Sequence, residues 1–237
     1  MNPKEIPIYI FQGLIVFSVI FICLIPVILV GLSLDPPIRS NILIFLATLF
    51  YYSIITISTA MATFLFIPSI IFRVFHIMPR EGEFDLTIYN KEVFKWLSSL
   101  GLYKISMIFG RISPITRYLV LLLFAAKLGK DVYFQGEVTE PYFLEVGDGT
   151  VIGDKAKIFT HIADKPGKVL FGRVRIGKNC LLGYASIVMP GSILEDNVIL
   201  GDYSIVPKNR IITSGVWVGI PAKKIKENSN IQRASTK

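Results

Sequence analysis

The chain has 237 residues, a mass of 26.6 kDa and a formal net charge of +8 at pH 7. Hydrophobic residues make up 52% of it and charged residues 18%, whereas a soluble domain usually has about 25% charged residues. This composition argues against a disordered chain and an ordinary soluble monomer, and it directs attention to membrane segments. Two cysteines cannot form a disulfide framework or a structural zinc site, and two histidines exclude a centre with three imidazole ligands.

Two long uncharged runs occupy the N-terminal third, from Ile6 to Leu34 and from Ser40 to Phe72. Each is longer than the about 20 apolar residues that span a bilayer, and the first is too long for the core of a signal peptide. The two prolines in the segment 35–39 stop a helix. We therefore expect a transmembrane helical hairpin over residues 1–73. Lys and Arg follow the second run, which predicts that both termini and the rest of the chain lie on the cytoplasmic side.

Residues 74–130 form a basic region in which we expect two amphipathic helices. Asn90 is a candidate N-cap for a helix that begins at Lys91, and Ser113-Pro114 is typical of a second helix start. Two interpretations remain open: helices that lie in the membrane interface, or a helical core packed on the next domain. Three aromatic residues fit the aromatic belt of the first interpretation, namely Trp96, Tyr103 and Tyr118.

Residues 131–226 carry a six-residue repeat. Counted in steps of six from Phe134 to Val218, Val, Ile or Leu fills twelve of fifteen positions, and only Glu140 and Asp164 are polar. Neither a helix nor an alternating strand has this period, but a triangular coil of three short strands does, with each aliphatic side chain pointing inward. We expect an all-β parallel β-helix of about five coils, followed by a polar tail over 227–237.

The repeat resembles the signature of the hexapeptide-repeat, left-handed parallel β-helix acyltransferases. The segments that carry the resemblance are Ile152–Ala156, Ile176–Cys180 and Leu200–Ser204, with Met189–Ile193 similar to the Pro-Gly corner of the acetyltransferases and Gly219–Lys223 similar to their closing segment. More narrowly, residues 113–160 resemble the membrane-attached β-helix units at the C-terminus of ε-poly-lysine synthetase, mainly through Pro141–Gly149. The chain lacks the adenylation and carrier regions of such synthetases, so their overall activity does not transfer.

Acyl transfer from a thioester to a hydroxyl or amine needs a base for the acceptor proton. His161 is the only histidine of the repeat region, and it lies three residues after an inward aliphatic, near a coil corner. The broken hexad Asp164–Gly167 should push a loop outward beside it. The resemblance implies that such a histidine is the base and that the site lies between two subunits of a homotrimer. Asn179, one 18-residue coil later, would position the acceptor, and Asp164 would orient the imidazole; an ordinary corner residue and a solvated carboxylate are the alternatives.

The resemblance also implies a donor slot along the later coils, with acetyl-CoA or another acyl thioester as co-substrate and no permanently bound cofactor or metal. Small residues would admit the donor, and basic residues would meet its phosphates: Ala185, Ser186, Ser204, Lys208, Arg210, Lys223 and Lys224. An ordinary surface lysine is the alternative for each basic residue. We expect Cys180 to be a core residue and His76 an interfacial side chain.

These observations predict a membrane-anchored O- or N-acyltransferase. It would move an acyl group, most simply acetyl, from a coenzyme A or carrier-protein thioester to a membrane-linked or small-molecule acceptor. The alternative is a non-catalytic β-helix scaffold that trimerises membrane partners. Nucleic-acid binding rests only on the net charge, and we do not expect it, because the basic residues cluster beside the apolar runs, where anionic lipid explains them better.

Overall fold

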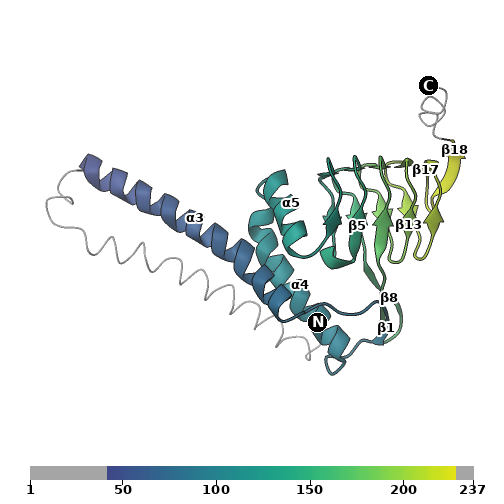
Figure 1. Cartoon of the computed structure of the whole chain (residues 1–237), viewed down its shortest axis with the longest axis horizontal. Coiled ribbons are helices and arrows are strands. Elements are labelled where there is room, and N and C mark those ends of the chain that lie inside the picture. Colours follow the sequence, from purple (N-terminus) through teal and green to yellow (C-terminus); the bar gives the residue numbers. More distant parts are fainter. Residues whose placement is uncertain (1–41, 228–237) are drawn as a thin grey trace. The chain divides into compact units, whose positions relative to one another are not determined.

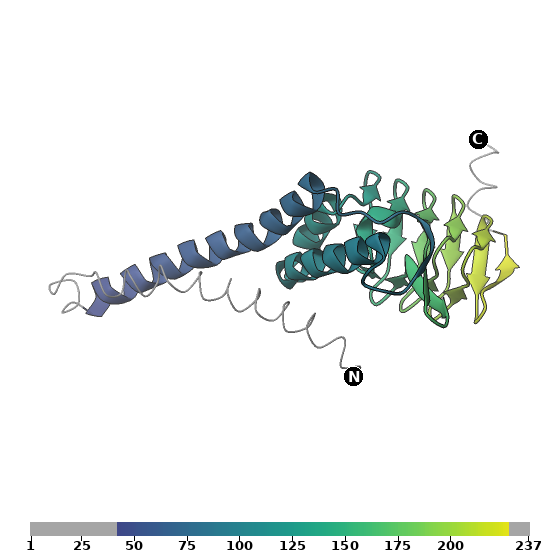
Figure 2. The same ribbon diagram turned by 90° about the horizontal axis from the view of Figure 1, so that it is seen from below.

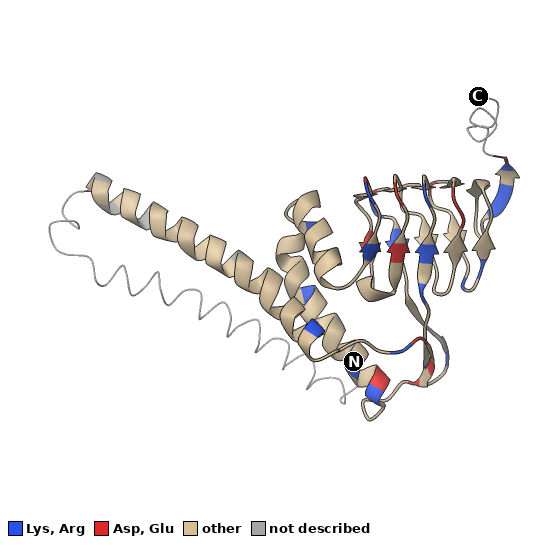
Figure 3. Ribbon diagram, viewed as in Figure 1, with Lys and Arg blue, Asp and Glu red and all other residues tan. Residues whose placement is uncertain are grey.

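The computed structural model describes residues 42–227. The first expected membrane helix, the turn after it and residues 228–237 of the tail lie outside the described residues. The chain divides into two units, Met1–Pro68 and Ser69–Lys237. Helix α3 (Ile42–Val74) forms from the second uncharged run, and Figure 3 shows no charge along it before Arg73. Its segment Leu46–Val74 has a mean hydropathy of 2.0 and, within the described residues, is the one helix long and apolar enough to cross a membrane. One long apolar helix is thus confirmed.

Both predicted helix starts of the basic region are confirmed. Helix α4 (Lys91–Gly110) begins after Asn90, whose side-chain oxygen accepts a hydrogen bond from the backbone N–H of Glu92 at 2.9 Å. Helix α5 (Pro114–Leu123) begins with a capping box between Ser113 and Thr116. These side chains satisfy backbone N–H groups that have no partner inside the helix. The short strand β1 (Gly82–Asp85) precedes α4.

Residues 127–226 form a β-solenoid of roughly five turns with three faces (Figures 1 and 2). The first face holds β2 (Lys127–Leu128), β5 (Leu144–Val146), β10 (Val174–Ile176), β13 (Ile193–Leu194) and β16 (Ile211–Ile212). The second holds β3 (Tyr133–Phe134), β6 (Val151–Ile152), β11 (Leu181–Leu182), β14 (Val198–Leu200), β17 (Gly215–Val218) and β18 (Lys223–Lys226). The third holds β4 (Glu137–Val138), β7 (Lys157–Ile158), β12 (Ile187–Val188) and β15 (Ile205–Val206). The left-handed sense of the solenoid stays a prediction.

The aliphatic residue of each hexad points into the prism, as the repeat predicts. Leu182 pairs with Ile152 in the coil before it and with Leu200 in the coil after it, and all three are fully buried. Each coil stacks its aliphatic side chains on those of its neighbours, and this column is the hydrophobic core. Burying apolar surface contributes about 25 cal/mol per Å², so the column is the main source of stability. Cys180 belongs to it, and burial raises the pKa of its thiol, as expected of a core residue.

The repeat departs from regularity twice, and both departures shape one corner. The inward residue that follows Phe134 is Val138, four positions on rather than six, and Leu144 and Val146, both on β5, are the next inward residues. Glu140 is therefore not at an inward position, contrary to the count by six; it lies at a corner, followed by the short helix η1 (Pro141–Phe143). The second departure is an antiparallel hairpin of β8 (His161–Lys165) and β9 (Lys168–Phe171). It confirms the loop expected after His161.

We predict that Leu182→Ala lowers the free energy of unfolding by about 2–5 kcal/mol, because the cavity left in the column cannot collapse fully. The adjacent residue on the same strand, Leu181, points outward and is 42% exposed. Leu181→Ala is the matched control and should cost about 1 kcal/mol or less. Denaturant unfolding of the purified variants measures both values. Equal losses in the two variants would contradict the assignment of the core.

Candidate active site

His161 lies at the corner where the third face of the solenoid passes to the first. Strand pairing puts four residues at equivalent positions of this corner in successive coils, and we call their line the site edge: Glu140, Thr160, Pro190 and Lys208. His161 follows Thr160 directly and opens the hairpin, and Gly172 closes it by donating its backbone N–H to the carbonyl of Thr160 at 2.9 Å. The hairpin thus leaves the solenoid beside the histidine and returns to the same point.

A buried carboxylate holds the imidazole. Glu140 is 1% exposed, and one of its oxygens lies 2.9 Å from Nδ1 of His161. The hydroxyl of Thr160 donates to Oε2 of Glu140 at 2.5 Å, and the indole N–H of Trp96, on α4, donates to Oε1 at 2.8 Å. A carboxylate taken out of water without such donors would cost several kcal/mol. Glu140 can therefore stay ionised at this buried position because these three groups donate hydrogen bonds to it.

The charge state of Glu140 fixes the role of each imidazole nitrogen. Burial raises the pKa of Glu140, but the hydrogen bond and charge of His161 and the hydroxyl of Thr160 outweigh burial, so that the pKa lies below its ordinary value of 4.5. An ionised carboxylate only accepts hydrogen bonds, so Nδ1 of His161 carries the proton. The lone pair of a neutral imidazole then lies on Nε2, where it can accept a proton from a substrate.

Aromatic rings surround the imidazole on the protein side. The ring of Trp96 lies 4.8 Å from that of His161, and the ring of Phe171 lies 5.5 Å from Trp96. The side chain of His161 is nevertheless 24% exposed. A partly exposed imidazole, held from behind by a buried carboxylate, can meet a substrate while its orientation stays fixed.

The hairpin that carries His161 is held by strand pairing and ion pairs to the segment before α4. Strand β1 pairs antiparallel with β9, which makes a three-stranded sheet in the order β1-β9-β8. Glu83 of β1 contacts the ammonium groups of Lys165 and Lys168 at 2.6 and 3.1 Å, and these hydrogen bonds lower its pKa. Arg173, just after the hairpin, pairs with Glu81 at 2.8 Å. These contacts restrict the hairpin and so the backbone of His161.

The structure does not bring Asn179 beside His161. Val146 pairs with Ile176, 30 residues later, whereas Ile176 pairs with Leu194, 18 residues later, so the coil with the hairpin is longer than a regular coil. Because the hairpin lengthens this coil, a residue 18 positions after His161, such as Asn179, does not stack on it. Asn179 lies at the corner between the first and second faces, in the left-handed conformation with φ of 52°. The side chain of Asp164 lies outside the described part of the chain.

The predicted donor residues fall into three places. Lys208 and Arg210 are both exposed; Lys208 lies on the site edge, and Arg210 lies two residues further on, before β16 of the first face. Lys223 and Lys224 lie in β18 on the second face, and Lys224 contacts Glu227 at 2.7 Å. Ala185 lies at the corner between the second and third faces. Ser186 and Ser204 are 1% and 0% exposed, so their side chains belong to the core, and the contact of a donor with the backbone beside them stays a prediction.

Sequence reasoning missed Glu140 and Trp96 as site residues. The sequence did contain a signal for Glu140, since it is one of two polar residues in an otherwise apolar series. Counting by six, however, made it only an exception to the repeat. Trp96 and Tyr103 were assigned to a membrane-surface belt under one interpretation. Instead, Trp96 bonds to Glu140, and Tyr103 is 7% exposed and packs on Phe124 at 5.4 Å. The α4 helix thus packs on the solenoid, as the other interpretation proposed.

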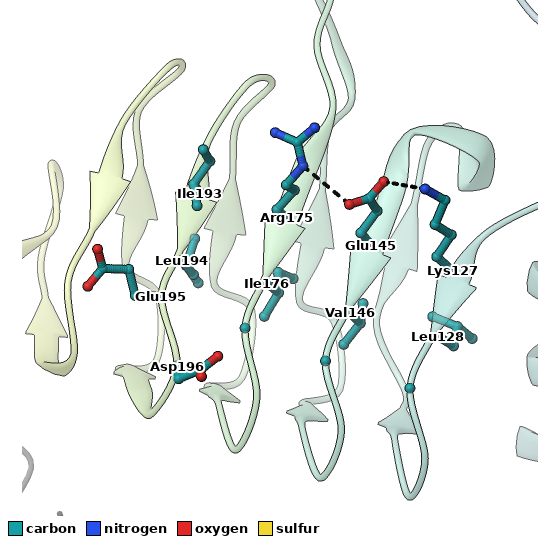
Figure 4. A pocket seen from close by; sticks show the side chains of 13 residues that line it. Lys127, Leu128, Glu145, Val146, Arg175, Ile176, Ile193, Leu194, Glu195 and Asp196 are labelled. Carbon is teal, nitrogen blue, oxygen red and sulfur yellow. Dashed lines mark hydrogen bonds and ion pairs between the residues drawn. The ribbon is translucent and has the colours of Figure 1, made fainter.

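A hollow lies on the first face, away from the site edge (Figure 4). Its upper rim is a ladder in which Glu145 contacts Lys127 at 2.9 Å and Arg175 at 3.2 Å, and the half-buried Ile193 follows in the next coil. The hollow is shallow, and the charges of the ladder satisfy one another. Among the described residues, no group of three or more His, Cys, Asp or Glu side chains could hold a metal ion.

No family model matches the chain. Solved structures resemble the solenoid at low identity. A maltose O-acetyltransferase from Clostridium difficile 630 is 20% identical, with a TM-score of 0.46, over 56% of this chain and 87% of that one. A hexapeptide-repeat acetyltransferase from Vibrio cholerae O1 biovar eltor, complexed with acetyl coenzyme A, is 12% identical, with a TM-score of 0.47, over 60% and 91%. An N-acyltransferase from Bacillus cereus, in complex with dTDP and 3-hydroxybutyryl-CoA, is 22% identical, with a TM-score of 0.36, over 48% and 79%.

We predict that Glu140→Gln reduces the acid sensitivity of the fold. A carboxylate whose folded-state pKa is lowered contributes stability above its unfolded pKa, and this contribution is lost as the pH falls through the folded pKa. The lowered pKa of Glu140 places this loss below pH 4.5. The variant lacks the charge, so its urea midpoint should fall less than that of the wild type between about pH 6 and about pH 3. Glu137→Gln, at an exposed position of β4, is the control; a wild-type-like acid loss in Glu140→Gln would contradict the assignment.

Proposed function

We propose that this chain is a membrane-anchored acyltransferase in which His161 is the general base. The observation that carries the proposal is the pairing of Nδ1 of His161 with the buried carboxylate of Glu140, which leaves Nε2 to accept a proton. This pair lies on a solenoid whose repeat resembles the hexapeptide signature of acyltransferases. A scaffold that only trimerises partners gains nothing from burying a charged group behind a partly exposed histidine.

The proposed reaction follows from the two nitrogens. Nε2 of His161 takes the proton of the acceptor hydroxyl or amine as the acceptor atom attacks the thioester carbonyl. The tetrahedral intermediate then expels the thiolate, which receives the proton from the imidazolium, so that a free thiol and an ester or amide result. Glu140 remains ionised throughout, holds Nδ1–H and stabilises the imidazolium that forms between the two steps. His161 and Glu140 both return to their starting protonation states when the reaction ends.

The donor would lie along the site edge. Lys208 is exposed on this edge and Arg210 beside it, beyond the coil that carries His161, and both would meet the phosphates of coenzyme A or of a carrier's pantetheine arm. The proposed slot would then have its basic end near the corner that holds the proposed base. Lys223 and Lys224, on the second face, have no such relation to His161.

The acceptor would reach the site at a membrane surface. Helix α3 is long and apolar enough to cross a bilayer, and it leads into the unit that holds the site. Large apolar side chains stay exposed on α4, on α5 and in the loop between them: Phe94, Ile108, Ile112, Ile115 and Leu119. Lys104 and Arg111 are exposed beside them, a combination that suits an anionic lipid interface. The packing of α4 on the solenoid is therefore compatible with a membrane-facing surface on the same helical region, which we propose in addition.

Assembly and orientation complete the proposal. The sequence resemblance implies a homotrimer with the site between subunits, and the basic flank of α3 favours the cytoplasmic side for the solenoid. Tethering to the bilayer raises the effective concentration of a lipid-linked acceptor, which a soluble enzyme would meet rarely. The donor is a coenzyme A thioester or an acyl-carrier thioester, and the acceptor is a hydroxyl or an amine.

Turnover of an acyl thioester by the detergent-purified protein tests the proposal. With acetyl-CoA and a membrane lipid extract, His161→Ala should slow thiol release and product labelling about 10²–10⁴-fold, because the general base is lost. His76→Ala removes the other histidine, which is exposed, and should leave the rate unchanged. Asn179→Gly keeps the left-handed corner and should also have little effect. No turnover with short or long acyl donors, or turnover indifferent to His161→Ala, would favour the scaffold.

The donor slot has its own test. Lys208→Ala combined with Arg210→Ala should raise KM for acetyl-CoA about 10-fold with kcat nearly unchanged, because contacts to the phosphates serve binding rather than chemistry. Lys223→Ala combined with Lys224→Ala removes the same charge from the second face and is the matched control. A larger effect in this control than on the site edge would show that the donor runs along a different part of the solenoid.

A further inference from the structure

Helix α4 contributes one side chain to the site, the indole of Trp96. Nε1 of Trp96 donates to Oε1 of Glu140 at 2.8 Å, and the ring lies 4.8 Å from that of His161. The other donors to this carboxylate, Thr160 and His161, lie at the solenoid corner and at the first residue of the hairpin. Trp96 therefore contacts both members of the pair at once, from an element 44 residues earlier in the chain.

The position of this indole is fixed by a second contact one turn along α4. The hydroxyl of Ser99 lies 2.9 Å from the phenol oxygen of Tyr142, and it also donates to the carbonyl of Trp96 at 2.8 Å. Tyr142 lies two residues after Glu140 and stacks on Phe72 at 5.5 Å. Two hydrogen bonds thus join α4 to the three-residue segment that begins with Glu140. The indole and the carboxylate are held as one rigid unit.

We propose that Trp96 is a positioning residue for the pair of Glu140 and His161. Its N–H directs one carboxylate oxygen, and its ring blocks rotation of the imidazole toward α4, so that Nε2 stays aimed at the substrate. This inference rests on the proposed function, because it assigns the helical region a part in the same reaction. A site built only from the solenoid would lack both constraints. Trp96 takes no proton and contacts no substrate in this proposal; it acts by holding Glu140 and the imidazole of His161 in place.

The chain offers a matched control for the indole. Trp217, on β17, also donates its indole N–H in a 2.8 Å hydrogen bond, to the carbonyl of Thr213, and it lies on the second face of the solenoid. Trp96→Phe keeps an aromatic ring and removes the N–H donor. We expect it to lower kcat about 10-fold and to leave KM for the acyl donor and acceptor within about 2-fold. Trp217→Phe should leave kcat unchanged, and equal effects of the two variants would overturn the proposal.

A double-mutant cycle separates positioning from general loosening of the structure. If Trp96 acts through Glu140, Trp96→Phe in the background of Glu140→Gln should lower kcat by less than about 2-fold, because the ionised carboxylate that it directs is already gone. Independent effects that multiply would overturn the proposal. Circular dichroism and the thermal midpoint of each variant show whether it is folded, and Trp96→Tyr provides a second variant if the phenylalanine form unfolds.

A spectroscopic readout keeps this inference separate from the proposed function. The wild-type protein should show a hydrogen-bonded Nδ1 proton of His161 in proton–nitrogen correlation spectra of ¹⁵N-histidine-labelled protein, assigned with His76→Asn. This resonance should be lost or broadened in Trp96→Phe and unchanged in Trp217→Phe. An unchanged resonance in Trp96→Phe would overturn the inference even if the enzyme turns over. Absence of turnover together with the expected loss would reject acyl transfer and retain the positioning role.

Discussion

The buried carboxylate of Glu140 is the constraint on which the site depends. At 1% exposure it can stay ionised only with donors around it, and three elements supply one each: the solenoid corner, the hairpin and α4. Removal of any of these elements leaves the buried charge with one donor fewer. The same carboxylate decides which nitrogen of His161 holds a proton. Local stability and the chemistry of the site therefore rest on one group.

This arrangement explains why the solenoid departs from its regular repeat at the corner of His161. The stacked aliphatic column needs only that each coil repeat the one before it, and Ile152, Leu182 and Leu200 do so without interruption. A regular coil has no room at its corner for a carboxylate, a histidine and their donors. The short step to Val138, the helix η1 and the hairpin after Thr160 create that room. The irregular segments are held by α4 and β1, which lie outside the repeat.

The parts of the molecule that obey a local rule could be predicted from the sequence. Period six predicts the inward column because the inside of the prism selects side chains by volume and polarity. Ser113-Pro114 predicts the start of α5 because capping is a contact between close neighbours in the chain. The place of Asn179 could not be predicted, because it depends on how many residues the hairpin adds to one coil. The contact of Trp96 with Glu140 could not be predicted either, since nothing in the local pattern of α4 distinguishes that indole from one at a membrane surface.

The central claim is that the site edge, with Nε2 of His161 at its middle, is the place of acyl transfer. An experimental structure of the detergent-purified protein bound to coenzyme A tests it most directly. If the donor binds at this corner, the thiol sulfur will lie within contact distance of Nε2 of His161, with the phosphates toward Lys208 and Arg210. Coenzyme A bound on another face, or an imidazole turned away from Glu140 in the complex, would contradict it.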